Sequence, residues 1–147
     1  MTERARLVGF NHIALEVDDL DEALDLYGRL FEFEFQGRHG DHMAFVGMGD
    51  QFLALIGGRT QPPDEARHFG LVVDDKEAAR AAVEREGLEI VPSRGLDFRD
   101  PWGNHFQVVD YRDIQFERSP GVKRKLGITH LEKTDAAKAE IAERDME

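Results

Sequence analysis

The stretch HFGLVVDD at residues 68–75 decides the fold, because the chain already contains a similar stretch, HIALEVDD, at residues 12–19. An offset of 56 residues (68 − 12) superimposes the histidine, a leucine, a valine and both aspartates. The similarity continues beyond these stretches, where Asp21 corresponds to Glu77 and Ala23 to Ala79. A solenoid needs about three or more repeats, so two copies predict a duplicated module that closes on itself.

Both copies alternate apolar residues with small or polar ones, which is typical of a strand with two different faces. The apolar positions are Ile13, Leu15 and Val17 in the first copy, and Phe69, Leu71 and Val73 in the second. His12 and His68 therefore begin their strands on equivalent faces, opposite to the face expected to pack on the core.

Each module is predicted to have the element order β-α-β-β-β. The expected elements of the first are the strand Leu7–Val17, a helix capped by Asp18 and Asp19 that ends near Phe31, and the strands Glu32–Gly37, Met43–Met48 and Gln51–Ile56. Those of the second are the strand His68–Val73, a helix from Asp75 to Glu86, and the strands Leu88–Pro92, Gly95–Arg99 and His105–Val109. Asp-Pro-Trp-Gly at residues 100–103 predicts a type I turn, which fixes the register of the last strand.

The resulting fold class is α+β. Modules at residues 7–57 and 67–111 are expected to form one eight-stranded, mixed but mostly antiparallel, barrel-like curved sheet with a helix outside each half. Residues 1–111 then make one domain, and residues 112–147 a partly helical C-terminal arm. Its helical segments are predicted to begin at Ser119-Pro120 and at Thr134. The arm has little apolar surface, so it is expected to pack on the barrel or on a partner subunit, with a frayed tail as the alternative.

Composition excludes several classes of function. The chain has 147 residues, 41% of them hydrophobic, which is enough for one globular domain. It contains no cysteine, which rules out disulfides and thiolate chemistry. A formal net charge of −11 argues against a nucleic-acid partner. Every apolar run is far shorter than about 18 residues, so we expect no membrane partner and a cytoplasmic location.

Side chains able to bind a metal are expected on one concave face. On the last strand, Phe106 and Val108 should face the helices, so that His105 and Gln107 share the face of His12 and His68. Two histidines and an oxygen donor suit a divalent ion such as zinc, manganese, nickel or iron. The alternative is that each histidine has only a structural role, and the repeated position leaves both interpretations open.

The paired modules, the histidine that opens each of them and the Asp-Pro-x-Gly-Asn turn at residues 100–104 resemble the vicinal oxygen chelate superfamily over residues 7–111. This superfamily includes glyoxalases, extradiol dioxygenases, fosfomycin-resistance enzymes and bleomycin-resistance proteins. The resemblance implies a small-molecule ligand and a homodimer, and the thin apolar surface of the C-terminal arm leads us to expect that the arm contributes to the dimer contact.

The resemblance also implies that His12, His68 and Gln107 are metal ligands. Gln107 occupies the position of the family's usual glutamate, and Ala54 that of a further glutamate present in glyoxalases. Because an amide and a methyl group cannot accept a proton, glutathione-dependent glyoxalase activity is not expected. Glu16 and His105 are the alternative candidates for catalytic acid or base, although His105 also fits a solvent-facing turn residue.

An apolar pocket is predicted next to the metal ligands. Phe52, Ala54 and Ile56 should line it, with Phe98 and Val109 as further candidates, although the same residues also fit ordinary core filling. Two functions remain open at this point. One is a metal-dependent enzyme that chelates neighbouring oxygens of a small molecule, and the other is a metal-free protein that sequesters a drug-like ligand.

Overall fold

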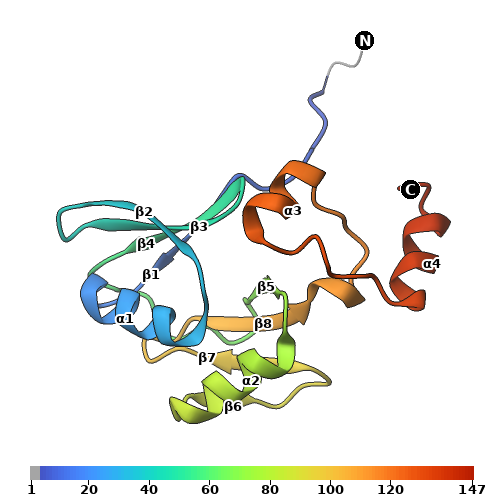
Figure 1. Cartoon of the computed structure of the whole chain (residues 1–147). Helices are drawn as coiled ribbons and strands as arrows, with labels where there is room; N and C mark the ends of the chain where they lie inside the picture. The colour runs from blue at the N-terminus through green and yellow to red at the C-terminus, as the bar shows by residue number, and fades with distance from the viewer. Residues whose placement is uncertain (1–3) are drawn as a thin grey trace.

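The computed structural model describes residues 4–147, and its elements follow the predicted order (Figure 1). The first module contains β1 (His12–Glu16), α1 (Leu20–Leu30), β2 (Glu34–His39), β3 (Met43–Met48) and β4 (Gln51–Ile56). The second contains β5 (Phe69–Val73), α2 (Lys76–Arg85), β6 (Glu89–Val91), β7 (Leu96–Arg99) and β8 (His105–Asp110). The 3₁₀ turn η1 (Tyr111–Asp113) and the helices α3 (Pro120–Leu126) and α4 (Asp135–Glu143) follow. Within these residues, no helix is long and apolar enough to cross a membrane.

The predicted α+β class and the two β-α-β-β-β modules are confirmed. The strands form two four-stranded mixed sheets, in the orders β1-β4-β3-β2 and β5-β8-β7-β6. In each sheet the first strand of the module runs parallel to the last, and the remaining pairs are antiparallel. The expected continuous eight-stranded sheet is absent from residues 4–147, because β1 and β5 both lie at the edge of their own sheet.

One hydrophobic core joins the two modules. It combines the apolar stripes of α1 and α2 with the helix-covered faces of both sheets. The Tyr27 ring of α1 meets the rings of Trp102 and Phe106 edge-on, at centroid distances of 6.4 and 6.1 Å. The helices also contact each other, which differs from the expected arrangement with each helix outside a common sheet (Figure 1).

The two histidine-bearing faces are equivalent, as the alternation predicted. In β1, Leu15 is buried in the core, whereas His12 and Ala14 are exposed. In β5, Leu71 packs against the core, whereas Gly70 and Val72 are exposed. Since the helix-covered faces share one core, the faces that carry the histidines are both directed away from it.

A buried carboxylate ties the modules together. Asp100 begins the predicted turn, in which Gly103 N–H donates to Asp100 O at 3.1 Å. Its Oδ2 accepts from Tyr27 Oη at 2.7 Å and from Asn104 Nδ2 at 2.9 Å. Burial raises the pKa of Asp100, and the hydrogen bonds from Tyr27 and Asn104 oppose this shift.

The same asparagine extends the connection to the first strand. Asn104 Nδ2 also donates to the carbonyl of Glu16 at 2.9 Å, and its Oδ1 accepts from Arg59 at 2.6 Å. The linker between the modules, which contains Arg59, is therefore fixed to the final turn of the second module.

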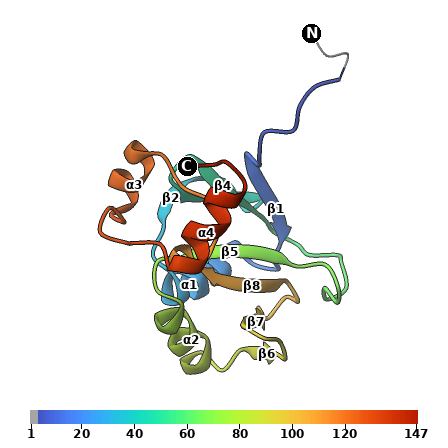
Figure 2. The same ribbon diagram turned by 90° about the vertical axis from the view of Figure 1, so that its right-hand side faces the viewer.

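Several strand boundaries differ from the prediction, most of them by one residue, and β1 and β2 differ by more. The first strand was expected from Leu7 but begins at His12, because its partner β4 begins at Gln51 and His12 already pairs with Phe52. Residues 4–11 extend from the body, with Leu7 99% exposed (Figures 1 and 2). β2 reaches His39 instead of ending at Gly37, because a register shift between Phe35 and Arg38 moves the turn along the chain.

The C-terminal segment packs on its own chain. Ser119 caps α3, as predicted, and Thr134, the predicted start of the second helical segment, caps α4. Lys133 Nζ lies 3.7 Å from the centre of the Tyr111 ring and donates to the carbonyl of Ile114 at 3.0 Å. Thr134 N–H donates to Arg112 O at 2.9 Å. These contacts bring α4 against the end of β8.

We predict that Asp110 makes stability depend on pH. Hydrogen bonds from the Arg112 side chain lower the pKa of Asp110 to about 2, despite the opposing effect of burial. A lowered pKa stabilises the folded state above the unfolded-state pKa of about 3.9, and this contribution is lost as the pH falls from there towards 2. Asp110→Asn should lower the free energy of unfolding at pH 7 by about 1–2 kcal/mol and flatten the curve below pH 4.

Urea unfolding across pH 2–7 measures this effect. The control is Asp113→Asn, which removes a nearby exposed carboxylate and should leave the pH dependence of stability nearly unchanged. If the free energy of unfolding depends on pH in the same way for both variants and the wild type, Asp110 is not the cause of this pH dependence.

Candidate functional site

His12 lies exposed on the outward face of the first sheet. Its ring stacks on Phe52 at a centroid distance of 4.8 Å and an interplanar angle of 10°. Phe45, which the sequence analysis did not single out, meets Phe52 edge-on at 5.8 Å. His12 Nδ1 lies 2.7 Å from Asn11 Oδ1, an oxygen that can only accept, so Nδ1 donates. Nε2 is then the ring nitrogen with the free lone pair.

His68 has the same arrangement of ring nitrogens at the duplicated position. It is exposed, and its Nδ1 donates to Ala66 O at 3.0 Å. A ring nitrogen oriented in this way by a hydrogen bond from the opposite nitrogen is the common arrangement for a metal-binding imidazole. The two modules therefore present equivalent Nε2 atoms on equivalent faces.

Gln107 lies on the same face of the second sheet as His68. It pairs with Gly70 of β5 and with Asp97 of β7, and directly opposite residues share a face. A side chain at Gly70 would meet nothing within 4 Å, so the space beside Gln107 is open.

His105 is buried and partnered, so the interpretation as a solvent-facing turn residue is wrong. Its side chain is 9% exposed, and its Nε2 lies 2.7 Å from Asp97 Oδ2. Nδ1 lies 3.3 Å from Glu65 O, and the ring centre lies 5.4 Å from that of His68. Because both ring nitrogens face oxygen acceptors, His105 acts here as a partner of Asp97.

The sequence analysis missed Asp97. Its side chain is 9% exposed, and Oδ1 is the one buried side-chain oxygen or nitrogen within residues 4–147 that has no hydrogen-bond partner. Asp97 lies opposite Gln107 on the neighbouring strand, but the family resemblance places no metal ligand on that strand.

Glu16 holds the linker. Its carboxylate accepts from the backbone and hydroxyl of Thr60 at 3.4 and 3.3 Å. Its carbonyl accepts from Arg59 at 3.0 Å as well as from Asn104. These contacts give Glu16 a structural role at the module junction.

The candidate residues fall into two groups. The first sheet carries His12, Glu16, Phe52, Ala54 and Ile56, and the second carries Asp97, His105 and Gln107, with His68 directly before β5. Among residues 4–147, no three histidine, cysteine, aspartate or glutamate side chains lie close enough to hold a metal ion. The donors of the second group nevertheless fit a divalent ion, since an imidazole nitrogen and an amide oxygen lie on one face with a buried, unpartnered carboxylate oxygen.

The expected pocket residues have different environments. Ala54 is buried, and Phe52 and Ile56 are half-buried. Phe98 does not belong to a pocket, because it is fully buried in the core beside Phe106. Val109 is half-buried on the outward face of β8, with Gln107.

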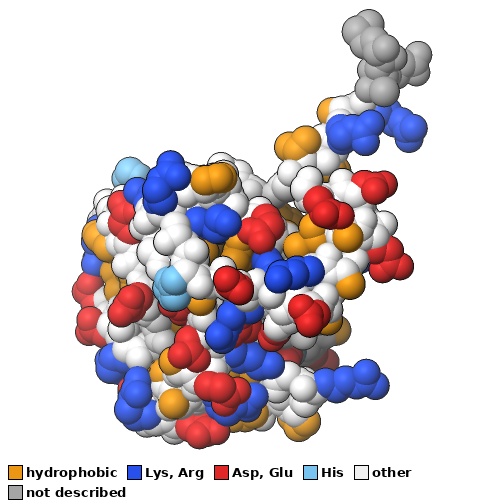
Figure 3. All heavy atoms as spheres, turned by 45° about the vertical axis from the view of Figure 1, so that its right-hand side comes forward, with side chains coloured by type: hydrophobic (Ala, Val, Ile, Leu, Met, Phe, Trp, Pro, Cys, Tyr) orange, Lys and Arg blue, Asp and Glu red, His pale blue; other side chains and the backbone are white. Residues whose placement is uncertain are grey.

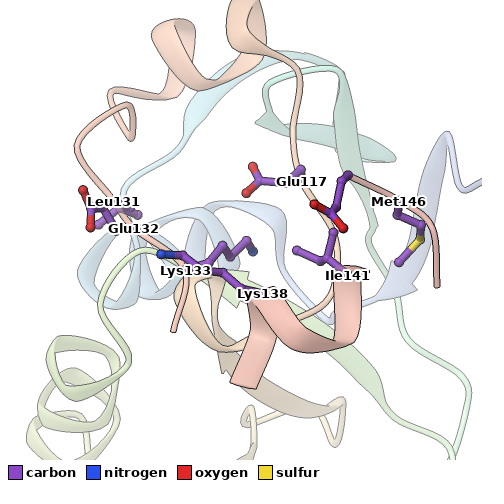
Figure 4. A pocket seen from close by; sticks show the side chains of 8 residues that line it. Glu117, Leu131, Glu132, Lys133, Lys138, Ile141 and Met146 are labelled. Carbon is purple, nitrogen blue, oxygen red and sulfur yellow. The ribbon is translucent and has the colours of Figure 1, made fainter. Parts of the chain in front are cut away.

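Two hollows lie elsewhere on the surface. One, of about 610 Å³, is bordered by the C-terminal segment, including Glu117, Lys133 and Ile141 (Figure 4). The other, of about 450 Å³, lies along residues 61–67 of the linker. Figure 3 shows acidic and basic side chains interspersed over one face, without a continuous basic surface.

Residues 9–108 match the Glyoxalase/Bleomycin resistance protein/Dioxygenase superfamily, and the chain belongs to this family. The fold is similar to that of fosfomycin resistance protein FosX from Listeria monocytogenes, with a TM-score of 0.61 and 16% identity over 71% of this chain and 94% of that one. Lactoylglutathione lyase from Agrobacterium tumefaciens has a TM-score of 0.57 and 22% identity over 72% of this chain and 96% of that one.

A metal ion is present in a further related structure. This is a mutant of the Listeria FosX, complexed with Mn(II) and 1S,2S-dihydroxypropylphosphonic acid. Its TM-score is 0.62, with 18% identity over 70% of this chain and 90% of that one. At these identities the likeness concerns the fold alone.

We predict that the two neighbouring histidines of the second sheet contribute differently to stability. His105→Ala leaves the buried Asp97 carboxylate without a partner and should lower the free energy of unfolding by about 3 kcal/mol. His68→Ala removes an exposed ring and should change it by less than about 0.5 kcal/mol. Urea unfolding at pH 7 measures both, and similar losses would contradict the pairing of His105 with Asp97.

Proposed function

We propose that the protein binds a divalent cation and, with it, a small molecule that carries two neighbouring oxygens. The observation that supports this most strongly is the matched pair of histidines. His12 and His68 occupy duplicated positions, and both donate through Nδ1, which leaves the Nε2 lone pair free. A purely structural role gives no reason for the same orientation of the ring nitrogens in both modules.

The cation ligands in this proposal are His12, His68 and Gln107. Zinc, manganese, nickel and iron all suit two imidazoles and an oxygen donor. A bound ion of this kind supplies Lewis acidity, which polarises oxygens of the ligand. The apolar side chains Phe52 and Ile56 share the face of His12 and are placed to contact the carbon skeleton of the ligand. The Mn(II) complex of a dihydroxy compound with the related FosX supports this class of ligand.

The proposal does not include glutathione-dependent isomerisation. Gln107 and Ala54 stand where glyoxalases carry glutamates, and neither side chain can accept a proton. His105 does not substitute for them in this structure, because both of its ring nitrogens face oxygen acceptors.

We predict one cation site per chain, measurable by titration calorimetry with zinc, manganese and nickel. His12→Ala and His68→Ala should each abolish binding, because each removes a nitrogen ligand. Gln107→Glu should tighten it, because a carboxylate neutralises part of the ion's charge. The matched control is His130→Ala, an exposed histidine after α3, which should bind like the wild type. Wild-type protein that binds none of these ions would overturn the proposal.

We also propose that the site is completed in a homodimer, with His12 of one copy facing His68 and Gln107 of the second. The two histidine faces are directed away from the shared core, and β1 and β5 leave one edge of each sheet unpaired within residues 4–147. A second copy can bring one such face against the other. The C-terminal segment packs on its own chain, so the histidine faces carry this proposal.

Mixed dimers test this arrangement. Equal amounts of His12→Ala and His68→Ala protein, unfolded and refolded together, should regain part of the cation binding, since a mixed dimer contains one intact His12–His68 pair. Light scattering should give the mass of a dimer. If the mixture binds no more than either variant alone while wild-type protein binds, the site lies within one chain.

A second candidate function is metal-free sequestration of a small molecule. The neutral Gln107 and the small Ala54 favour this function, because a family member without catalytic activity does not need the glutamates that glyoxalases carry at these two positions. The exposed stack of His12 on Phe52 offers an aromatic surface for such a ligand. Absence of cation binding in the wild type and in Gln107→Glu alike favours this function.

A further inference from the structure

We infer that Asp97 supplies the cation site with the carboxylate that Gln107 lacks, an inference that rests on the proposed cation-binding function. The carboxylate then lies on β7 instead of β8, and the pairing of these two strands places it beside Gln107. Three features of this part of the fold support the inference.

The first feature is the register of the sheet. Asp97 pairs directly with Gln107 across the antiparallel β7–β8 ladder. Side chains at such paired positions share a face, with Cβ atoms about 4.5–5.5 Å apart. A carboxylate on β7 can therefore reach the neighbourhood of the Gln107 side chain without any change in the backbone.

The second feature is the unused oxygen of Asp97. His105 holds Oδ2 at 2.7 Å, while Oδ1 is buried without a hydrogen-bond partner. A buried polar atom of this kind costs roughly 1–3 kcal/mol and needs a reason. A carboxylate fixed by one oxygen, with the other left available, is the usual state of an oriented metal ligand.

The third feature is the balance of charge around Asp97. Two imidazoles and an amide are neutral ligands, so a divalent ion held by them alone keeps its full charge in a partly dry site. The basic residue two positions along β7, Arg99, is already paired with Glu89 and with the carbonyl of Asp64. Within residues 4–147 no lysine or arginine forms a salt bridge with Asp97, whose one ion-pair partner is the ring of His105, and its Oδ1 has no partner.

Moving the carboxylate between the paired positions tests the inference. Titration calorimetry with Mn²⁺ and Zn²⁺ compares the wild type with Asp97→Asn, Gln107→Glu and the double variant Asp97→Asn/Gln107→Glu. Asp97→Asn keeps the size of the side chain and an oxygen that can accept from His105, and it should weaken binding at least about tenfold. The double variant has one carboxylate in the site again and should bind close to the wild type.

Two controls separate this result from general effects. Asp25→Asn removes the same charge from an exposed position of α1 and should bind like the wild type. Thermal unfolding of each variant shows whether it is folded at the temperature of the titration. Each variant is titrated at a temperature at which its unfolding curve shows it to be folded, and a folded double variant with affinity well above the wild type would overturn the inference.

The outcomes distinguish the inference from the function on which it rests. In one outcome the wild type binds, Asp97→Asn binds with unchanged affinity, and the double variant binds as tightly as Gln107→Glu alone. This outcome overturns the role of Asp97 and leaves the proposed function in place. Wild-type protein that binds neither ion overturns both. A loss in Asp97→Asn that the double variant restores supports both.

Discussion

The Asp100 carboxylate is the constraint on which the arrangement of the modules depends. It lies at the start of the turn before β8 and accepts hydrogen bonds from Tyr27 of the first module and from Asn104 of its own turn. Asn104 in turn bonds the end of β1 and the linker residue Arg59. Because a charged group buried at this depth costs several kcal/mol unless its oxygens are satisfied, the two modules must meet in the orientation that supplies these donors.

This orientation determines where the chemistry can occur. With the helix-covered faces in one core, the faces that begin with His12 and His68 are directed outward on separate sheets. Within one chain the cluster around His105, Asp97 and Gln107 therefore develops on the second sheet alone. The proposed dimer follows from this geometry, since a ligand held between equivalent faces requires the faces of two copies.

The inference about Asp97 describes a family site that changes without losing its charge balance. Gln107 has the position of a ligand but not its charge, and Asp97 has the charge at the position directly opposite. Strand pairing makes such an exchange simple, because two residues that are ten apart in sequence have neighbouring side chains. The His105 ring orients Asp97 through a hydrogen bond and is not a solvent-exposed group.

The sequence by itself determined the duplicated modules, the order of the elements and the equivalence of His12 and His68. Each of these depends on local periodicity and on the 56-residue offset, which are properties of the chain alone. Even the exact limits of β3 and β4 followed from alternation and turn residues. The early start predicted for β1 failed because a strand ends where its partner ends, and β4 provides no partner before Gln51.

Only the tertiary structure decided that the strands form two sheets, that the helices lie together, and that His105 is buried with Asp97. These features depend on contacts between residues far apart in sequence, such as Tyr27 with Asp100. Asp97 looked like an ordinary polar residue of a strand, since its burial and its unpartnered oxygen arise from the linker, His105 and β8 folding around it. Alternation assigns a residue to a face of a sheet, but the packing of the whole chain determines whether that face is dry, covered or open to a ligand.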